Sequence, residues 1–275
     1  MKKKWCYILL IPGLSIILFF LVLPIINSIL PTFVVRDKIG LLQYSSFLKD
    51  EYFMQIFYRT IKISLLASLF CMIFGVPVAY FISRSSQKLR GLLIACTVFP
   101  MLTNSVVRAF AWMNILGKNG LINKLLMSLN LIKEPYKLLY TESAILIGTV
   151  YLFLPLMIVS LVGVMENIDN DLLEAAESLG ANKVKAFFKV VFPLSIPGLI
   201  VGTVLVFTGS LTAYTTPQLL GGNSNMVLST LIYQKTISLG DWSGAAVVAT
   251  VMIITTLLVI ETINKLASKL NERGV

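Results

Sequence analysis

Long apolar stretches separated by shorter polar segments run through the whole chain. Six of these stretches are long enough for a helix that crosses a bilayer, which takes about 20 residues. The six stretches cover residues 6–30, 60–82, 91–116, 142–164, 194–216 and 242–267. Several contain Gly or Pro, which transmembrane helices tolerate where neighbouring helices cover the backbone. The pattern predicts an all-α polytopic membrane protein with six transmembrane helices in a single domain, residues 1–275.

The first stretch follows three lysines, as the apolar core of a signal peptide also would. A signal peptide has a shorter core and a cleavage site with small residues. This stretch instead ends in the sequence Ser28-Ile29-Leu30-Pro31. We therefore expect a retained first helix whose amino end lies in the cytoplasm.

The composition supports the membrane class. The chain is 57% hydrophobic and 13% charged, whereas soluble domains carry about 25% charged residues. Its formal net charge of +10 would also fit a protein that binds nucleic acid. The basic residues, however, gather at the ends of the apolar stretches, where membrane topology explains them. We therefore expect a lipid bilayer, and no nucleic acid, as a partner of this chain.

The basic residues also predict the orientation in the membrane. An even number of spans places both termini on one side, and basic residues concentrate in cytoplasmic loops. The outer segments would carry nearly as many basic residues, but over much longer loops. Both termini are therefore expected in the cytoplasm. The inner segments then carry Lys2, Lys3, Lys4, Arg84, Lys88, Arg90, Lys183, Lys185, Lys189, Lys265, Lys269 and Arg273.

A charged segment, residues 169–193, separates the fourth and fifth apolar stretches. Asp169, Asn170 or Asp171 can cap a helix that begins here, and Gly180 can supply the left-handed residue that ends it. A second helix follows, and Pro193 is expected to end that helix. The segment therefore predicts a pair of short helices joined by a turn on the cytoplasmic face.

The same segment resembles the EAA loop of ABC importer permeases. The resemblance rests on Glu174-Ala175-Ala176, on Gly180 four residues later, and on residues 191–194, VFPL. In that family the loop is a pair of coupling helices, so the resemblance implies docking on a cytoplasmic ATP-binding cassette ATPase dimer. Glu174 would offer a charge to this partner, Ala175 and Ala176 would allow close approach, and Gly180 would fix the turn. The alternative is an ordinary amphipathic loop, since Glu and Ala are common in helices.

Four further motifs resemble the spermidine/putrescine importer permeases. They are Thr103–Arg108 (TNSVVR), Gly117–Asn123 (GKNGLIN), Pro217–Gly222 (PQLLGG) and Asp241–Ala246 (DWSGAA). The resemblance implies an importer of the bacterial plasma membrane with a second, related permease subunit and an extracellular substrate-binding protein. It also implies that ATP and Mg are bound by the partner ATPase, with no cofactor in this chain.

The sequence contains no glycine-rich loop of the Walker A type and no candidate acid–base pair. We therefore expect a transport subunit without enzymatic activity of its own. A secondary transporter is the alternative from another class, but it would need an intramembrane ionisable relay or inverted repeats. Only Arg108 and Glu261 are charged residues of that kind.

Polar residues within the third and fifth stretches are the candidate translocation pathway. Asn104, Arg108 and Trp112 lie four residues apart and share a helical face. Thr212 and Tyr214 lie near the outer end of the fifth stretch. The alternatives are that Arg108 reaches the membrane interface, that the threonine bonds between helices, and that Trp112 is an interface anchor.

The resemblance makes a polyamine the expected substrate, with one departure from the pattern. A polycation should meet carboxylates or an aromatic cage, yet residues 211–216, LTAYTT, contain no acid. Glu142 is the one nearby carboxylate. An anionic or zwitterionic solute, such as a phosphonate or an opine-like compound, is therefore the alternative.

Overall fold

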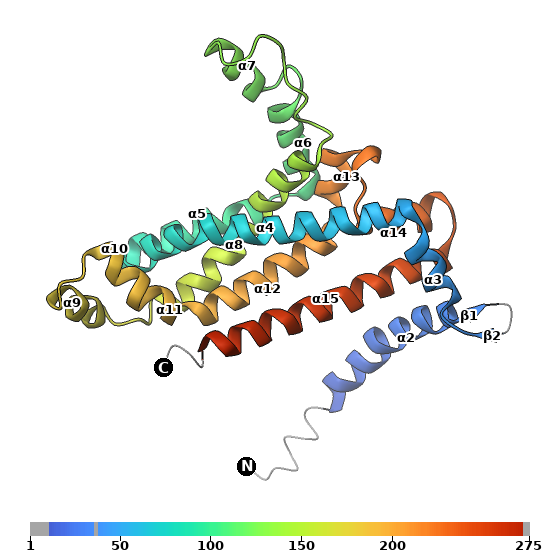
Figure 1. Cartoon of the computed structure of the whole chain (residues 1–275), viewed down its shortest axis with the longest axis horizontal. Helices are drawn as coiled ribbons and strands as arrows, with labels where there is room; N and C mark the ends of the chain where they lie inside the picture. The colour runs from blue at the N-terminus through green and yellow to red at the C-terminus, as the bar shows by residue number, and fades with distance from the viewer. Residues whose placement is uncertain (1–10, 36–37, 272–275) are drawn as a thin grey trace. The chain divides into compact units, whose positions relative to one another are not determined.

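The computed structural model of the chain describes residues 11–35 and 38–271 (Figure 1). Nearly all regular structure in these residues is helical, which confirms the predicted all-α class. The exception is a short antiparallel pair of strands, β1 (Val34–Val35) and β2 (Lys38–Ile39). The chain divides into two compact units, Met1–Gln55 with Leu231–Ile254 and Ile56–Thr230 with Thr255–Val275.

Long apolar helices account for the predicted spans. Counting each of two bent helix pairs as one span gives six candidate spans in the described residues, the number that the sequence predicts. Four are single helical segments: Ile11–Phe33, Glu51–Ser83, Glu142–Met165 and Trp242–Lys265. The bent pairs are Gln87–Leu102 with Ser105–Ser128, at 92°, and Lys183–Leu194 with Ile196–Thr212, at 67°.

The first unit joins the first apolar helix to the start of the last one. Thr32 is buried, and its hydroxyl group is hydrogen-bonded to the hydroxyl of Tyr44. Asp241 accepts a hydrogen bond from the Gly244 amide at 2.8 Å and so caps the last helix. The elements of this unit are η1 (Leu18–Val22), α2 (Leu23–Ile29), η2 (Leu30–Phe33), β1, β2, α3 (Leu42–Lys49), η5 (Gln234–Ser238) and the start of α15 (Trp242–Asn271).

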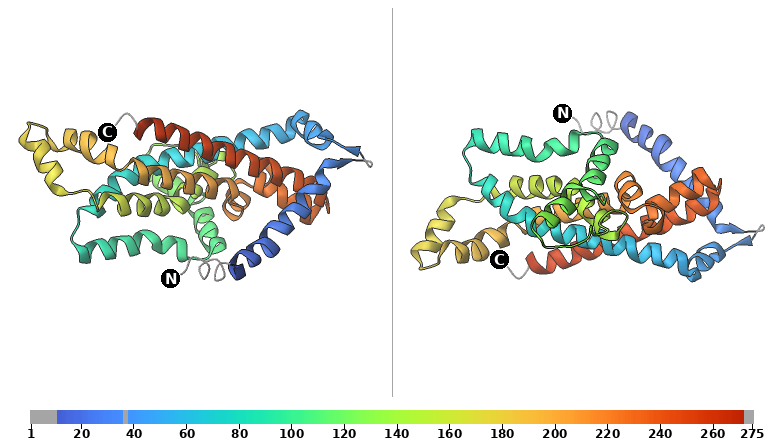
Figure 2. Two further views of the ribbon diagram at one scale, coloured as in Figure 1. Left: turned by 90° about the horizontal axis from the view of Figure 1, so that it is seen from below. Right: turned by 90° about the horizontal axis from the view of Figure 1, so that it is seen from above.

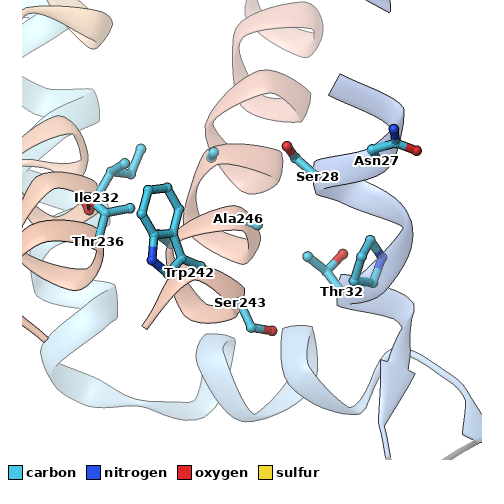
Figure 3. Close-up of a pocket in the computed structure, with 11 residues that line it drawn as sticks. Asn27, Ser28, Thr32, Ile232, Thr236, Trp242, Ser243 and Ala246 are labelled. Atoms are coloured by element: carbon cyan, nitrogen blue, oxygen red, sulfur yellow. Dashed lines mark hydrogen bonds between the residues drawn. The ribbon is translucent and has the colours of Figure 1, made fainter. Parts of the chain in front are cut away.

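A hollow in the first unit opens between α2, η5 and α15 (Figure 3). Trp242 and Ser243 line it from α15, and Ser28 and Thr32 line it from the opposite wall. The hydroxyl groups of Ser28 and Thr32 already donate to backbone carbonyls of their own segment. None of the predicted site residues lines this hollow.

The second unit is a helical bundle built around α8. Its buried core joins α4 and α8 through apolar side chains such as Ala79, Ile82, Met157 and Leu161. The elements are α4 (Glu51–Ser83) from Ile56 on, α5 (Gln87–Leu102), α6 (Ser105–Leu116), α7 (Leu121–Ser128), α8 (Glu142–Met165), α9 (Asn170–Ser178), α10 (Lys183–Ala186), η3 (Phe187–Val191), α11 (Phe192–Leu194), α12 (Ile196–Thr212), α13 (Thr215–Gly221), η4 (Asn223–Asn225), the start of α14 (Leu228–Tyr233) and α15 from Thr255 on.

Two glycines let α12 approach α8 closely. A Cβ atom at Gly198 would lie 2.8 Å from the backbone oxygen of Ser160, and one at Gly202 would lie 2.6 Å from the Sδ atom of Met157. Small residues four apart are a common way for membrane helices to pack. The GLIVG sequence at 198–202 therefore fixes the main helix contact of this unit.

Two predicted spans are interrupted in the structure. The stretch 91–116 breaks after Leu102, because the Asn104 side chain accepts hydrogen bonds from Val106 and Val107 and so caps a new helix, α6. The stretch 194–216 breaks at Ala213, which leaves the helical conformation between α12 and α13. The second span, by contrast, begins earlier than predicted, since α4 runs without interruption from Glu51.

Pro193 does not end the second helix of the charged segment, contrary to the prediction. The helix continues to Leu194 because a π-turn, η3, precedes the proline. In this turn the Phe192 amide donates to the Phe187 oxygen, five residues earlier. The wider turn relieves the clash that a proline ring makes with the preceding turn. The η1 turn before Pro24 has the same arrangement.

Candidate functional site

The predicted turn between the two short helices is present. Gly180 has a φ of +88°, and its amide donates to the Glu177 oxygen at 2.9 Å. The Ala181 amide donates to the Ala176 oxygen at 3.1 Å. This pair of bonds satisfies the last carbonyls of α9 in the pattern known as a Schellman motif. Asp169 caps the other end of α9 by accepting a hydrogen bond from the Asp171 amide.

The two helices extend beyond the ends of α8 and α12 (Figure 2). Glu174 and Ala175 are exposed on α9, and Ala176 is half-buried. Leu179, just before the turn, is 89% exposed, and Val184 is 66% exposed. Exposed apolar side chains beside an exposed acid are typical of a docking surface. Sequence reasoning missed Leu179, although an apolar residue directly before a turn glycine is a recognisable signal.

Arg108 holds the bend between α5 and α6. Its Nη1 atom donates to the Pro100 oxygen at 2.6 Å and lies 3.3 Å from the Thr103 hydroxyl oxygen. The Pro100 carbonyl belongs to the last turn of α5, where carbonyls lack partners within the helix and a cation is favourable. Arg108 and Asn104 thus act on opposite sides of one break.

Trp112 pairs with an aromatic residue that sequence reasoning missed. Its ring meets that of Tyr151 on α8 edge to face, with 5.4 Å between centroids. Both rings line two hollows, one of which is also lined by Arg108 and the other by Phe70 and Phe74. A single Tyr inside an apolar helix gives no signal of this pairing in the sequence.

Thr212 and Tyr214 lie on either side of the break between α12 and α13. The Thr212 hydroxyl donates to the Thr208 oxygen at 2.9 Å, so it bonds within its own helix. Tyr214 is half-buried at the position before α13. The structure therefore brings Asn104, Arg108 and Trp112 together on α6, while the other two candidates belong to α12 and its end.

Glu142 is neutralised by two cations from α4. Arg59 Nε lies 2.9 Å from Glu142 Oε1, and Lys62 Nζ lies 3.0 Å from Oε2. Arg59 also donates to the Met226 oxygen at 3.1 Å, which ties α4 to the segment before α14. Glu142 is the one nearby carboxylate that the sequence offered to a polycationic substrate, and it is already paired within the protein.

Asn123 organises the segment between α6 and α8. It is fully buried, and its Nδ2 atom donates to the backbone oxygens of Gly117, Lys118 and Tyr136 at 2.9–3.2 Å. Its Oδ1 atom accepts from the Tyr136 amide at 2.9 Å. This is the last residue of the GKNGLIN motif, and its bonds explain why an amide side chain is needed there.

A metal site is not visible in the part of the chain that the structure describes. No group of three or more His, Cys, Asp or Glu side chains in residues 11–35 and 38–271 is placed to hold an ion.

Comparison with known proteins identifies the family. Residues 72–270 match the family described as "Binding-protein-dependent transport system inner membrane component". The chain belongs to this family. It is thus the permease subunit of an ABC importer and a multi-pass protein of the inner membrane, in a family whose members lack an ATPase of their own.

Curated relatives of this permease include transporters of different solutes. The spermidine/putrescine transport system permease protein PotB of Salmonella typhimurium strain LT2 is 30% identical over 94% of this chain and 92% of its own. PotB of Escherichia coli strain K12 is 32% identical over 88% and 90%. The probable sulfate transport system permease protein cysT of Prototheca wickerhamii is 31% identical over 74% and 79%.

Solved structures confirm the fold of this permease. A chain of a bacterial ABC transporter that imports the acidic polysaccharide alginate gives a TM-score of 0.81. The alignment covers 98% of this permease and 96% of that chain, at 19% sequence identity. A chain of the MetNI methionine ABC transporter gives a TM-score of 0.55 over 82% of this permease.

Proposed function

We propose that the permease forms the translocation pathway of an ABC importer for polyamines, spermidine or putrescine. The observation that carries this proposal is the similarity to the PotB proteins along nearly the whole length of both chains. The proposed partners are an ATPase dimer that binds ATP and Mg, a second related permease, and an extracellular substrate-binding protein. In the proposed topology both termini and α9 face the cytoplasm.

The proposed mechanism begins at α9. Closure of the ATPase dimer on ATP would displace the pair α9–α10 as a rigid body. Glu174 would pair with a basic or hydrogen-bonding group of the ATPase, and Ala175 and Ala176 would let the two backbones come close. Because the loop continues into α8 and α12, its displacement would tilt both helices and open the pathway to alternate sides.

The proposed route for a polyamine relies on aromatic faces rather than on carboxylates. Trp112 and Tyr151 offer π surfaces, to which an ammonium group is attracted by about 0.5–2 kcal/mol. Glu142 contributes little to this route, since Arg59 and Lys62 already neutralise it.

The charges favour a second candidate, import of an anionic or zwitterionic solute such as a phosphonate or an opine-like compound. Arg108 lines the hollow beside Trp112, and the Glu142 cluster carries one carboxylate against two cations. Either substrate class is compatible with the same coupling loop, because the loop acts on the helices and not on the solute.

Uptake measurements test the proposal. Cells that express the complete transporter, with and without this permease, are given labelled spermidine, with unlabelled putrescine or 2-aminoethylphosphonate as competitor. We expect uptake that requires the permease and is blocked by putrescine. A complex that assembles and hydrolyses ATP but imports no spermidine would contradict the polyamine substrate and leave the second candidate.

A further inference from the structure

The Arg84 side chain joins α4 to the amino end of the coupling loop, residues 169–193. Arg84 directly follows α4, and its Nη1 atom donates to the Ile168 oxygen at 2.9 Å and to the side-chain oxygen of Asn170. Ile168 and Asn170 lie on either side of Asp169, the residue that caps α9. One guanidinium therefore connects the end of a span to the first turn of α9.

Tyr80, one turn earlier on α4, contacts the second helix of the loop. Its ring packs edge-on against Phe187, with 4.9 Å between centroids and 65° between planes. The guanidinium carbon of Arg84 lies 5.8 Å from the centre of the Tyr80 ring. Tyr80 and Arg84 thus form one stacked unit that contacts both helices of the coupling loop.

The Arg84 guanidinium has donors to spare. Its Nε and Nη2 atoms are buried and have no hydrogen-bond partner among the described residues. Buried donors without partners raise the free energy of the state that contains them. The carboxylates of Glu166 and Asp169 line the same polar hollow as Arg84. A cation with unused donors beside two acids can exchange partners when α9 is displaced.

Arg90, in the same hollow, makes a different kind of contact. Its Nη1 atom lies 3.0 Å from Glu166 Oε2, and its Nη2 atom donates to the Ser83 oxygen at 2.9 Å. These partners are the residue that follows α8 and the last residue of α4. Arg90 therefore fastens the spans to each other, whereas Arg84 is the arginine that contacts α9.

We propose that Arg84 is a positioning residue that carries the displacement of the coupling loop across to α4. This transmission rests on the proposed function, since it requires an ATPase that moves the loop. The main chain already connects the coupling loop to α8 and α12, and the Arg84 side chain adds a third connection, to α4. The span α4 then moves together with α9 rather than after it.

Two measurements on the complete reconstituted transporter test this role. The first is labelled spermidine uptake per ATP hydrolysed in the wild type and in Arg84→Ala, Arg84→Lys and the control Lys88→Ala, an exposed cation at the start of α5. The second needs no substrate: spin labels at the exposed positions Ser86 and Ser178 report the separation of the α4–α5 turn from α9, with and without ATP and Mg.

We expect Arg84→Ala to lower uptake per ATP about three- to tenfold, as mutations within coupling networks do. Arg84→Lys keeps the charge and should restore part of the loss, which a purely structural role would not predict. In the wild type the distribution of distances between the two labels should stay narrow when ATP is added. In Arg84→Ala the same distribution should broaden. Lys88→Ala should match the wild type in both measurements.

The outcomes separate this inference from the proposed function. Uptake per ATP and label separations equal to those of the wild type in Arg84→Ala would overturn the transmission role. Another outcome is a wild type that imports no spermidine, while ATP broadens the distance distribution between the labels in Arg84→Ala and not in the wild type. That result would contradict the proposed polyamine substrate and support the transmission role of Arg84. If Arg84→Ala fails to assemble, Asn170→Ala removes one acceptor at an exposed position, and Asn170→Asp should retain coupling.

Discussion

The two ends of the second unit differ in how far their polar side chains are bonded within the fold. At the end that carries α7, Asn123 uses its whole side-chain amide within the fold, and Glu142 is paired by two cations. At the end that carries α9, Glu174, Leu179 and Val184 are exposed, and Arg84 leaves two donors unused. The first end is built to keep its shape, because its polar groups are satisfied internally. The second keeps polar and apolar groups available for a partner.

Reversing the charge of Glu174 should have the largest effect on function. We expect Glu174→Lys to lower uptake at least about tenfold while ATP hydrolysis and membrane insertion continue, because breaking a desolvated charge pair costs about 2–5 kcal/mol. Uptake and hydrolysis are measured on the same purified complex. Glu177→Lys, an exposed acid one turn along the helix, is the matched control. Uptake at the wild-type level in Glu174→Lys would rule out docking through this residue.

Removing the Asn123 amide should have the largest effect on local stability. Asn123→Leu removes the acceptor of the Tyr136 amide and the Nδ2 donor of the Lys118 carbonyl, and it takes one of two donors from the Gly117 and Tyr136 carbonyls. This loss should cost about 2–4 kcal/mol. Hydrogen exchange at the Tyr136 amide measures this loss directly. The exposed neighbour Asn119 supplies the control Asn119→Leu, which should exchange as the wild type does. Equal protection in both variants would mean that the segment is held by something else.

The turn at Gly180 should be more sensitive to substitution than a helical glycine. Gly180→Val forces a branched residue to a φ of +88°, at a cost of about 1–2 kcal/mol. The yield and thermal unfolding of the assembled complex give the readout. Gly163→Ala is the control, since a Cβ there meets nothing within 4 Å. A normal yield of Gly180→Val would count against the importance of this turn for docking.

The start of α15 offers the weakest test, since its cap, Asp241, is only half-buried. The Gly244 amide and then Lys235 lower the pKa of Asp241. A carboxylate whose pKa is lower in the folded state stabilises it above the unfolded pKa and loses this effect as pH falls through the folded pKa. The wild type should therefore exceed Asp241→Asn in stability by less than about 1 kcal/mol at pH 7. The two melting temperatures should converge below about pH 4, and a constant difference would contradict the assignment.

Local signals in the sequence predicted much of the helix pair at residues 169–193 and less of the contacts around Arg108. Gly180 and Asp169 take the predicted turn and cap positions because a turn glycine and a helix cap act on backbone groups a few residues away. Arg108 is one of the predicted residues, but its contact with the Pro100 carbonyl depends on the bend between α5 and α6. The sequence gives no sign of this bend, because residues 91–116 form one apolar stretch. The sequence did not predict the pairing of Tyr151 with Trp112, because the two residues lie on different helices.

The sequence by itself determined the membrane class, the number of apolar segments, the helix pair at residues 169–193 and the family. These features follow from hydrophobicity and short-range backbone preferences, which are additive along the chain. Only the tertiary structure decided that two spans are bent, that Pro193 is accommodated by a π-turn, and that Arg84 contacts α9. Such contacts join residues up to 86 positions apart, and their energy depends on geometry that no local pattern encodes.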